Sequence, residues 1–411
     1  MSKAAKTATV AWLLAAVYYF YQYSLRSAPG VMIPQLSDAF GLSALGVASL
    51  IGLFYYGYSP FSLVAGAAMD RLGARKVIPV GAAAVGIGAL LFGSGSQDAA
   101  NVGRVLQGAG GVFALVGAVY IATTHFPPSR AATLIGATQM FGMAGGSAGQ
   151  FVVGPLIEGG VSWNVFWTAM GFSGLAISVV LFLFLPKDEM KRTTDHGMKA
   201  TLRAFCGVFR NPQSILCGMI AGLLFIPTTI FDMIWGVRFL QEARGFEYAD
   251  AVIRSSMVPV GWIIGCPLLG ALSDRIGRRK PVIIGGAVVL LASMAFALYG
   301  EVGFLPPYLV GIVAGIASGA AMLPYTVIKE ANRPEWSGTA TGVVNFLNFT
   351  FSALLGPAFA LMLQSVTAGS ERELTHYQIT FEPLLYGVAI AVVLTMFLRE
   401  TGPKGTAGSN R

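Results

Sequence analysis

The chain alternates long apolar stretches with short polar ones along its whole length. An apolar run of about 20 residues crosses the hydrocarbon core of a bilayer as an α-helix. Runs such as 161–185 are too long and too uniformly apolar for the short alternating strands of a membrane β-barrel. The pattern therefore predicts twelve transmembrane helices, at about 8–30, 45–68, 77–96, 100–124, 132–157, 163–185, 214–240, 252–272, 281–299, 304–328, 337–364 and 380–398.

The longest polar stretch lies between the sixth and seventh predicted helices. It divides the chain into an N-terminal bundle (1–185), a linker (186–212) and a C-terminal bundle (213–411). Residues 198–209 of the linker favour an amphipathic helix on the membrane surface. Composition agrees with a membrane protein, since 55% of the residues are hydrophobic and only 11% are charged, whereas soluble chains carry about 25% charged residues.

One short polar loop occurs twice. The first copy reads Gly66-x-x-x-Asp70-Arg71-x-Gly73-x-Arg75-Lys76, and the second reads Gly270-x-x-x-Asp274-Arg275-x-Gly277-x-Arg279-Lys280. The copies lie 204 positions apart, about half of the 411 residues. The spacing predicts a duplicated membrane domain with two pseudo-symmetric halves.

Each position in this loop has a physical use. The glycines at 73 and 277 suit a tight turn. The aspartates at 70 and 274 can accept hydrogen bonds at the N-terminus of a neighbouring helix, where the helix dipole favours an anion. The basic residues that follow place the loop on the cytoplasmic side.

The distribution of charge predicts the orientation. With a cytoplasmic N-terminus, 20 of the 27 Lys and Arg residues fall on the cytoplasmic side, and the opposite loops hold mainly acids. We therefore interpret the net charge of +8 as a topology signal and exclude a nucleic-acid surface. We expect a bacterial inner (plasma) membrane protein with both termini in the cytoplasm.

The repeated loop resembles the signature that the major facilitator superfamily carries between its second and third helices and between its eighth and ninth. The resemblance covers nearly the whole chain. It implies an all-α protein of two six-helix bundles that works as a secondary transporter. In that family the loop is a gate latch, so the resemblance implies a gating role for Asp70, Arg71, Asp274 and Arg275.

Ionisable residues within the spans are functional candidates, because a charge in the bilayer is costly. Arg26 ends the first span and is followed by Met32-Ile33-Pro34-Gln35-Leu36. This arrangement resembles the organic-anion branches of the superfamily, the organophosphate:phosphate antiporters and anion:cation symporters, in which the matching arginine holds the substrate's carboxylate or phosphate. A guanidinium binds planar anions through two parallel hydrogen bonds. The alternative is an arginine that snorkels to the outer interface.

Two further charges are candidates for coupling or gating. Arg104 lies in an arginine-glycine stretch that resembles the superfamily's fourth-helix motif, with Gly111 where some symporters carry an acid; a structural arginine bonded to helix carbonyls is the alternative. Asp232 is the only acid deep in the seventh span. A carboxyl group in apolar surroundings can carry a proton, and its repeat-equivalent position is 28, so we expect Asp232 to face Arg26. The alternative is a structural aspartate paired with Arg238.

Polar and aromatic residues complete the predicted substrate site, since an amide or hydroxyl in the membrane needs a partner. With Arg26, the candidate substrate-binding residues are Gln22, Tyr23, Tyr55, Gln139, Trp235, Tyr325 and Asn345. The three cysteines and three histidines form no metal-binding pattern. We expect no metal and no cofactor. The sequence contains no nucleotide-binding loop, so we do not expect ATP to drive the protein.

The sequence thus predicts a secondary transporter and not an enzyme. We expect it to be a monomer in the lipid bilayer. The predicted substrate is a small organic anion, a carboxylate, and the predicted coupling partner is a proton or another ion. Two alternatives stay open. Arg26 and Asp232 together would suit a zwitterion such as an amino acid, and Asp232 among Met and aromatic residues would suit a drug or metabolite efflux pump.

Overall fold

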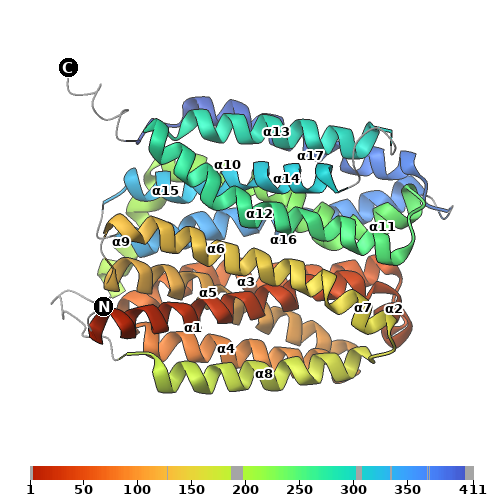
Figure 1. Cartoon of the computed structure of the whole chain (residues 1–411), viewed down its shortest axis with the longest axis horizontal. Coiled ribbons are helices and arrows are strands. Elements are labelled where there is room, and N and C mark those ends of the chain that lie inside the picture. The colour runs from red at the N-terminus through yellow and green to blue at the C-terminus, as the bar shows by residue number, and fades with distance from the viewer. Residues whose placement is uncertain are drawn as a thin grey trace.

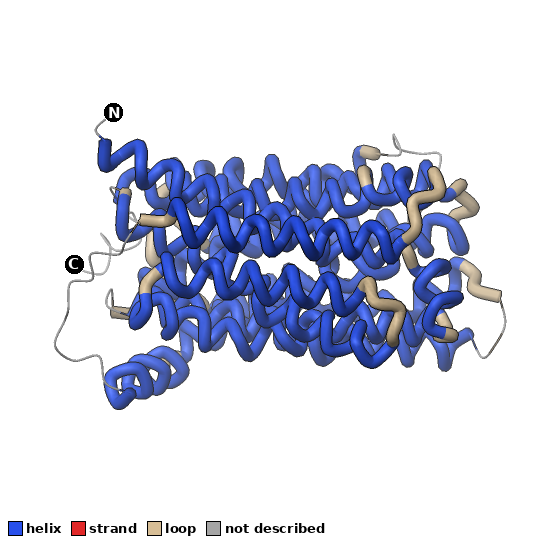
Figure 2. Tube along the Cα trace, turned by 90° about the horizontal axis from the view of Figure 1, so that it is seen from below, coloured by secondary structure: helices blue, strands red, loops and turns tan. Residues whose placement is uncertain are grey.

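The computed structural model describes residues 3–126, 128–186, 198–301, 308–333, 336–367, 369 and 371–402. Within these ranges the side chains of 3–6, 70–71, 123, 128–133, 135, 198–201 and 337 are left out of the description. In the part of the chain that is described, every regular element is a helix (Figure 2). The predicted all-α class is confirmed.

The N-terminal half consists of long helices that fall on the predicted spans, with short helical segments at one end. Ser43 and Ser96 set two of the helix starts, because their side chains accept hydrogen bonds from the backbone N–H groups of Gly46 and Ala99. The elements are α1 (Lys3–Ser27), η1 (Ala28–Val31), α2 (Ile33–Phe40), α3 (Ala44–Leu72), α4 (Ala74–Phe92), α5 (Gln97–His125), α6 (Pro128–Phe151), α7 (Val153–Glu158) and α8 (Trp163–Phe184).

The C-terminal half follows α9 (Met198–Arg210), which confirms the helix predicted at 198–209. Its first span is irregular: α10 (Pro212–Ile226) continues as a π-helix, η2 (Pro227–Trp235), before α11 (Gly236–Arg238) and a second π-helix, η3 (Phe239–Ala243). The remaining elements are α12 (Tyr248–Ile276), α13 (Lys280–Tyr299), α14 (Leu309–Ser318), η4 (Gly319–Met322), α15 (Leu323–Glu330), α16 (Ser337–Thr367) and α17 (Leu374–Phe397).

Eleven stretches of the described chain are helical, long and apolar enough to cross a membrane. The first predicted span corresponds to α1, which has 25 residues but a lower hydropathy. The reason is visible in its sequence, because α1 carries Gln22 and four tyrosines. These polar groups contribute to the site described below. Together with the eleven more apolar stretches, α1 brings the transmembrane helices of the described chain to twelve.

The two halves lie side by side, with helices running along the long axis (Figure 1). Within the N-terminal half α3 packs tightly on α5: a Cβ added to Gly57 would lie 2.0 Å from the carbonyl oxygen of Val105, and one added to Gly108 would lie 1.9 Å from that of Phe54. Between the halves α3 packs along α16, and α6 packs along α12. These are the second with the eleventh helix and the fifth with the eighth, a pairing that the duplication predicts.

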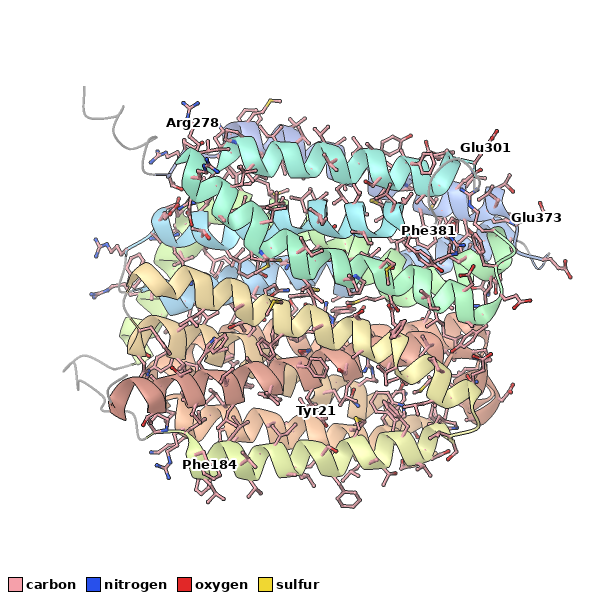
Figure 3. All side chains as sticks on the ribbon, viewed as in Figure 1. Tyr21, Phe184, Arg278, Glu301, Glu373 and Phe381 are labelled. Atoms are coloured by element: carbon pink, nitrogen blue, oxygen red, sulfur yellow. The ribbon has the colours of Figure 1, made fainter. Side chains whose placement is uncertain are left out.

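The start of α1 and the end of α17 lie at one end of the bundle, where Arg278 is found, and Glu301 and Glu373 lie at the other (Figures 1 and 3). We call these the basic end and the acidic end. The repeated loops turn at the basic end, where Gly73 has φ 77° and Gly277 has φ 73°. These left-handed values explain the two glycines.

Candidate functional site

Arg26 lies at the centre of the candidate site. It is in the last turn of α1 and only 3% of it is exposed. Its Nε and Nη2 each donate to the hydroxyl of Tyr55 at 3.3 Å, and Nη1 has no hydrogen-bond partner among the described residues. Five aromatic rings surround the guanidinium, with centroids 4.7 to 5.7 Å from Cζ: Tyr23, Phe54, Tyr55, Tyr58 and Phe349.

The partners of Arg26 show how deep it lies. Tyr55 is 11 residues from the start of α3 at the acidic end, or roughly 16 Å along the axis at 1.5 Å per residue. Phe349 is 12 residues from the start of α16 at the basic end. Arg26 therefore lies midway along the bundle, and the alternative of an arginine that snorkels to the outer interface is not supported.

The Arg26 site lies where the two halves meet. The Tyr55 hydroxyl, which accepts from Arg26, also donates to the backbone carbonyl of Thr229 in η2 at 3.4 Å. The ring of Phe349 from α16 stacks on that of Tyr55, with centroids 6.0 Å apart and planes inclined by 10°. Both halves therefore contribute to the surroundings of a single charge.

No carboxylate balances Arg26 among the described side chains. The ion pairs found there join other residues: Arg238 with Glu242, Arg254 with Asp250, Arg279 with Asp274 and Glu330, and Arg372 with Glu242. Aromatic faces stabilise a cation, but by only about 0.5–2 kcal/mol each. A buried guanidinium with an unbonded Nη1 is chemically suited to take an anion from a substrate.

A cluster of uncharged polar residues lies next to the site toward the basic end. Tyr325 donates to Asn345 Oδ1 at 2.9 Å and accepts from Asn348 at 2.9 Å. Asn345 in turn donates to Ser62 of α3 at 2.8 Å. The predicted residues Tyr325 and Asn345 are therefore brought together, one turn of α16 from Phe349, and they join α15, α16 and α3.

On the N-terminal side the structure brings together the predicted residues of α1 and α6. Gln139 accepts a hydrogen bond from Tyr19 at 3.1 Å, and the ring of Tyr19 packs edge-on against Tyr23. The Tyr23 hydroxyl and both polar atoms of the Gln22 amide are buried without a partner among the described residues. These groups remain available to a ligand beside Arg26.

Two predicted residues lie elsewhere. Trp235 is buried, with the guanidinium of Arg372 over its ring at 5.8 Å. Asp232 accepts from the hydroxyl of Ser255 in α12 at 3.1 Å through Oδ1, and its Oδ2 has no partner among the described residues. The described contacts of Asp232 and Arg26 have no residue in common, which does not fit the expected face-to-face pair. The predicted pairing with Arg238 is also not found, because Arg238 pairs with Glu242.

Arg104 is fully buried and joins three helices. Its Nη1 donates to the carbonyl of Leu25 at 3.2 Å and to Gln107 at 2.8 Å, and its Nη2 donates to the carbonyl of Ile51 at 3.2 Å. These are the contacts of the structural alternative, an arginine bonded to helix carbonyls. A part for Arg104 in coupling stays a prediction.

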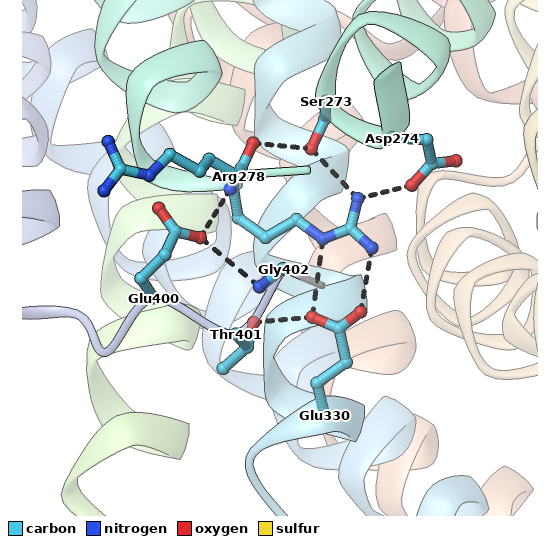
Figure 4. Close-up of polar contacts among 8 residues, drawn as sticks. Ser273, Asp274, Arg278, Glu330, Glu400, Thr401 and Gly402 are labelled. Atoms are coloured by element: carbon cyan, nitrogen blue, oxygen red, sulfur yellow. Dashed lines mark hydrogen bonds and ion pairs between the residues drawn. The ribbon is translucent and has the colours of Figure 1, made fainter. Parts of the chain in front are cut away.

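The second repeated loop forms a latch at the basic end (Figure 4). Asp274 pairs with Arg279 at 2.5 Å, and Arg279 also pairs with Glu330 of α15 at 2.9 Å. Burial lowers the pKa of Arg279, but its hydrogen bonds to Glu330 and Asp274 outweigh that effect and raise it. Arg275, the predicted partner in gating, is exposed. The side chains of Asp70 and Arg71 lie outside the described residues.

The halves touch on both sides of Arg26. Toward the basic end Ser59 of α3 donates to the carbonyl of Phe346 at 2.9 Å, beside the contact of Asn345 with Ser62. Toward the acidic end Tyr248 of α12 donates to the carbonyl of Val31 at 2.8 Å, and Ser147 donates to that of Ser256 at 3.4 Å. The arrangement is that of a closed state with Arg26 enclosed.

Known proteins resemble this chain in sequence and in fold. A sequence model of the Major Facilitator Superfamily matches residues 14–357, most of the chain. The chain belongs to this superfamily. It is 26% identical to a hexuronate transporter of Bacillus subtilis over 82% of this chain and 83% of that protein, and 23% identical to a probable sulfoacetate transporter of Cupriavidus necator over the same shares. A solved structure of a bacterial homolog to the human lysosomal transporter Spinster, inward-facing and unoccupied, superposes with a TM-score of 0.69 at 16% identity, covering 97% of this chain and 96% of that one.

As a superfamily member, the chain is an integral membrane transporter rather than an enzyme. The twelve helices in two bundles are the superfamily's fold, as predicted. The latch built on Asp274 occupies the position of the repeated superfamily signature, although its cation is Arg279 and not the neighbouring Arg275.

Three of the five rings around Arg26 are not among the candidate residues listed from the sequence: Phe54, Tyr58 and Phe349. Phenylalanine is the commonest aromatic residue in the chain, so neither Phe54 nor Phe349 stood out. Helical spacing carried a signal nevertheless: Phe349 is four residues from the candidate Asn345, and Tyr58 is three from the candidate Tyr55, so each shares a helix face with a candidate.

Proposed function

We propose that this superfamily member is a secondary transporter that moves a small organic anion, a carboxylate, across the membrane by alternating access. The observation that carries the proposal is Arg26: a guanidinium 3% exposed, at the contact between the halves, with Nη1 unbonded and no carboxylate partner among the described residues. An anion bound there supplies the missing charge and bridges the halves, so its arrival and departure can be linked to their relative movement.

The relatives support an anionic substrate. Hexuronate and sulfoacetate, named for two of them, are organic anions that carry a carboxylate. The site offers one guanidinium. The organophosphate branch of the superfamily would carry a second arginine near the position of Thr229, and this chain has none there. A single cation favours one carboxylate over a phosphate dianion. The separate surroundings of Arg26 and Asp232 favour an anion over a zwitterion, which needs both charges in one site.

The test is uptake of radiolabelled mono- and dicarboxylates into proteoliposomes. Arg26→Ala should lower uptake of the accepted substrate at least 100-fold, because removing one partner of a desolvated ionic contact weakens binding by about 3–5 kcal/mol. Arg203→Ala, which removes an exposed arginine of α9, is the matched control and should keep uptake near that of the wild type. Unchanged uptake in Arg26→Ala would refute the assignment, and substrates restricted to amino acids would favour the zwitterion alternative.

We further infer that a proton is the coupling ion and that Asp232 carries it. The buried carboxyl group with a free Oδ2 supports this role. Anion at Arg26 and proton at Asp232 would favour each other's binding, as linkage requires. Substrate affinity should then rise as pH falls in the wild type and lose this dependence in Asp232→Asn. An identical pH profile in both proteins would make Asp232 structural.

The orientation is proposed with the basic end in the cytoplasm, because Lys and Arg gather on the cytoplasmic side of membrane proteins. The chain supplies its own probe: Cys206 on α9 is exposed, and Cys217 and Cys266 are buried. A membrane-impermeant maleimide should label Cys206 in inside-out vesicles and not in right-side-out ones, with the Cys206→Ser chain as control. Labelling in right-side-out vesicles alone would reverse the orientation.

A further inference from the structure

Asp232 borders a cavity that is separate from the Arg26 site. The cavity has a volume of about 150 Å³ and lies inside the C-terminal half, between η2, η3, α12, α13 and α14. Asp232 and Ser255 line one part of it. Apolar side chains form most of its wall, among them Phe231, Phe239, Leu290 and Met294. Arg26 is not among its lining residues.

The cavity reaches the acidic end of the bundle. Its lining includes Glu301, which is exposed and lies at that end (Figure 3), and Arg244, from the irregular end of the seventh helix. A volume of about 150 Å³ has room for several water molecules, each of which takes about 30 Å³ in the liquid. The cavity therefore offers a small, partly polar passage from the acidic end to the buried carboxyl group.

The charges around the passage are largely engaged with one another. From α12, Arg254 pairs with Asp250 at 3.0 Å and lies over the ring of Phe246. From η3, Arg244 donates to the carbonyl of Ala297 at 2.7 Å. Glu301 follows α13, and the cavity-lining residues of α13 and α14 are uncharged. On the neighbouring α11, Arg238 pairs with Glu242. The unbonded oxygen that the described residues present here is Asp232 Oδ2.

The π-helix η2 separates this cavity from the anion site and touches both. Asp232 belongs to its cavity side, while the carbonyl of Thr229, three residues earlier, accepts the hydroxyl of Tyr55 that holds Arg26. Hydroxyl Oγ of Ser255 donates to Asp232 Oδ1 at 3.1 Å and lies 3.4 Å from its backbone carbonyl oxygen. π-helical segments within longer helices occur frequently at functional sites. A change at the Asp232 carboxyl group therefore acts directly on the segment that supports Tyr55.

We propose that this C-terminal cavity is a dedicated proton port: protons enter from the acidic end, bind Asp232 Oδ2, and act on Arg26 through η2 and Tyr55, without sharing the substrate's path. The inference rests on the proposed proton coupling and deepens it, because it assigns the proton's route. Binding adds one proton to Asp232 Oδ2, and deprotonation of the same oxygen returns it, so no further reactant is involved.

The first test narrows the cavity. Ser293 of α13 lines it, and Val288, which helical spacing puts on the opposite side of the same helix, is 50% exposed and is not among the lining residues. In proteoliposomes with an imposed pH gradient, Ser293→Phe should reduce gradient-driven anion accumulation at least tenfold. Exchange of labelled for unlabelled anion at equal pH on both sides should stay within about twofold. Val288→Phe adds the same ring outside the cavity and should retain both activities.

A second measurement avoids the risk that a bulky residue disturbs folding. Ser293→Cys is introduced into a chain whose Cys206, Cys217 and Cys266 are replaced by Ala, and a charged methanethiosulfonate is added from the acidic side. Modification, followed by mass, should block accumulation, and saturating substrate should not protect the thiol. Absence of modification, protection by substrate, or full accumulation after modification would each overturn the separate port.

The outcomes also separate this inference from the proposed function. Uptake that does not need Arg26 would refute the anion site. A pH profile unchanged in Asp232→Asn would refute proton coupling and the port together. A pH profile that needs Asp232, combined with normal accumulation in Ser293→Phe, would refute the port alone, and the proton would then reach Asp232 by the substrate's path.

Discussion

Two of the buried ionisable residues of this transporter, Arg26 and Asp232, are accommodated in opposite ways. Arg26 lies between the halves, surrounded by five rings and held by a hydroxyl that also bonds to the other half. Asp232 lies within one half, with one hydroxyl partner and a cavity that extends toward the acidic end. A group at the contact between the halves feels their movement, whereas a group inside one half moves with it. This difference supports the proposal that the first position holds the substrate and the second holds the coupling ion.

The largest effect is expected when an aromatic ring is removed beside Arg26 rather than from the wall of the C-terminal cavity. Phe349 is buried, stacks on Tyr55 and lies 4.7 Å from the Arg26 guanidinium. Phe349→Ala should lower the free energy of unfolding by about 3–5 kcal/mol and abolish substrate binding, measured by thermal unfolding with and without the anion. Phe231 in the cavity wall is only partly buried, so Phe231→Ala should cost less stability and leave anion binding within a few fold. Equal losses of binding in both variants would remove the distinction.

A moderate effect is expected at the link between the halves. Tyr55→Phe keeps the ring but removes the hydroxyl that accepts from Arg26 and donates to Thr229. Loss of a hydrogen bond to a charged group costs about 1.5–3 kcal/mol, so the substrate's Kd should rise at least tenfold. Tyr56→Phe on the exposed face of the same helix is the control. The Kd is measured by isothermal titration calorimetry. A Kd within twofold of the wild-type value would mean that the Tyr55 hydroxyl is not the group that holds Arg26 ready for the substrate.

The smallest effect concerns the hydroxyl partner of Asp232. Ser255→Ala removes its hydrogen bond to Asp232 Oδ1. At a pH low enough to keep Asp232 protonated in both proteins, we expect the substrate's Kd to stay within about twofold, because no contact of Arg26 is changed. The pH dependence of uptake should move, since the bond to the carboxylate is lost. A large change in Kd together with an unmoved pH profile would reverse the roles given to the two charges.

Much of the fold could be predicted because each transmembrane helix needs a long apolar run and because the loop at 70–76 recurs at 274–280. Arg26 could be predicted as well, since charge is rare within the spans. Its aromatic surroundings could not, because Phe54 and Phe349 become partners of Arg26 only when α3 and α16 pack together. The expected pairing of Arg26 with Asp232 rested on the repeat, which makes position 28 the equivalent of Asp232 only if the first and seventh spans wind alike. The seventh span winds as a π-helix at 227–235, which turns side chains away from the directions that α-helical spacing predicts.

The residues that follow α17 also hold the start of another helix, α13. The Glu400 carboxylate accepts the backbone N–H groups of Arg279 at 2.6 Å and Lys280 at 3.2 Å, and Thr401 contacts Glu330 (Figure 4). Residues more than a hundred positions away thus cap the first turn of α13. This contact limits how the chain can be modified. Shortening the chain before Glu400, or fusing a reporter domain close to it, should disturb the latch formed by Asp274, Arg279 and Glu330. Purification tags and fluorescent partners are therefore better placed at the N-terminus of this transporter.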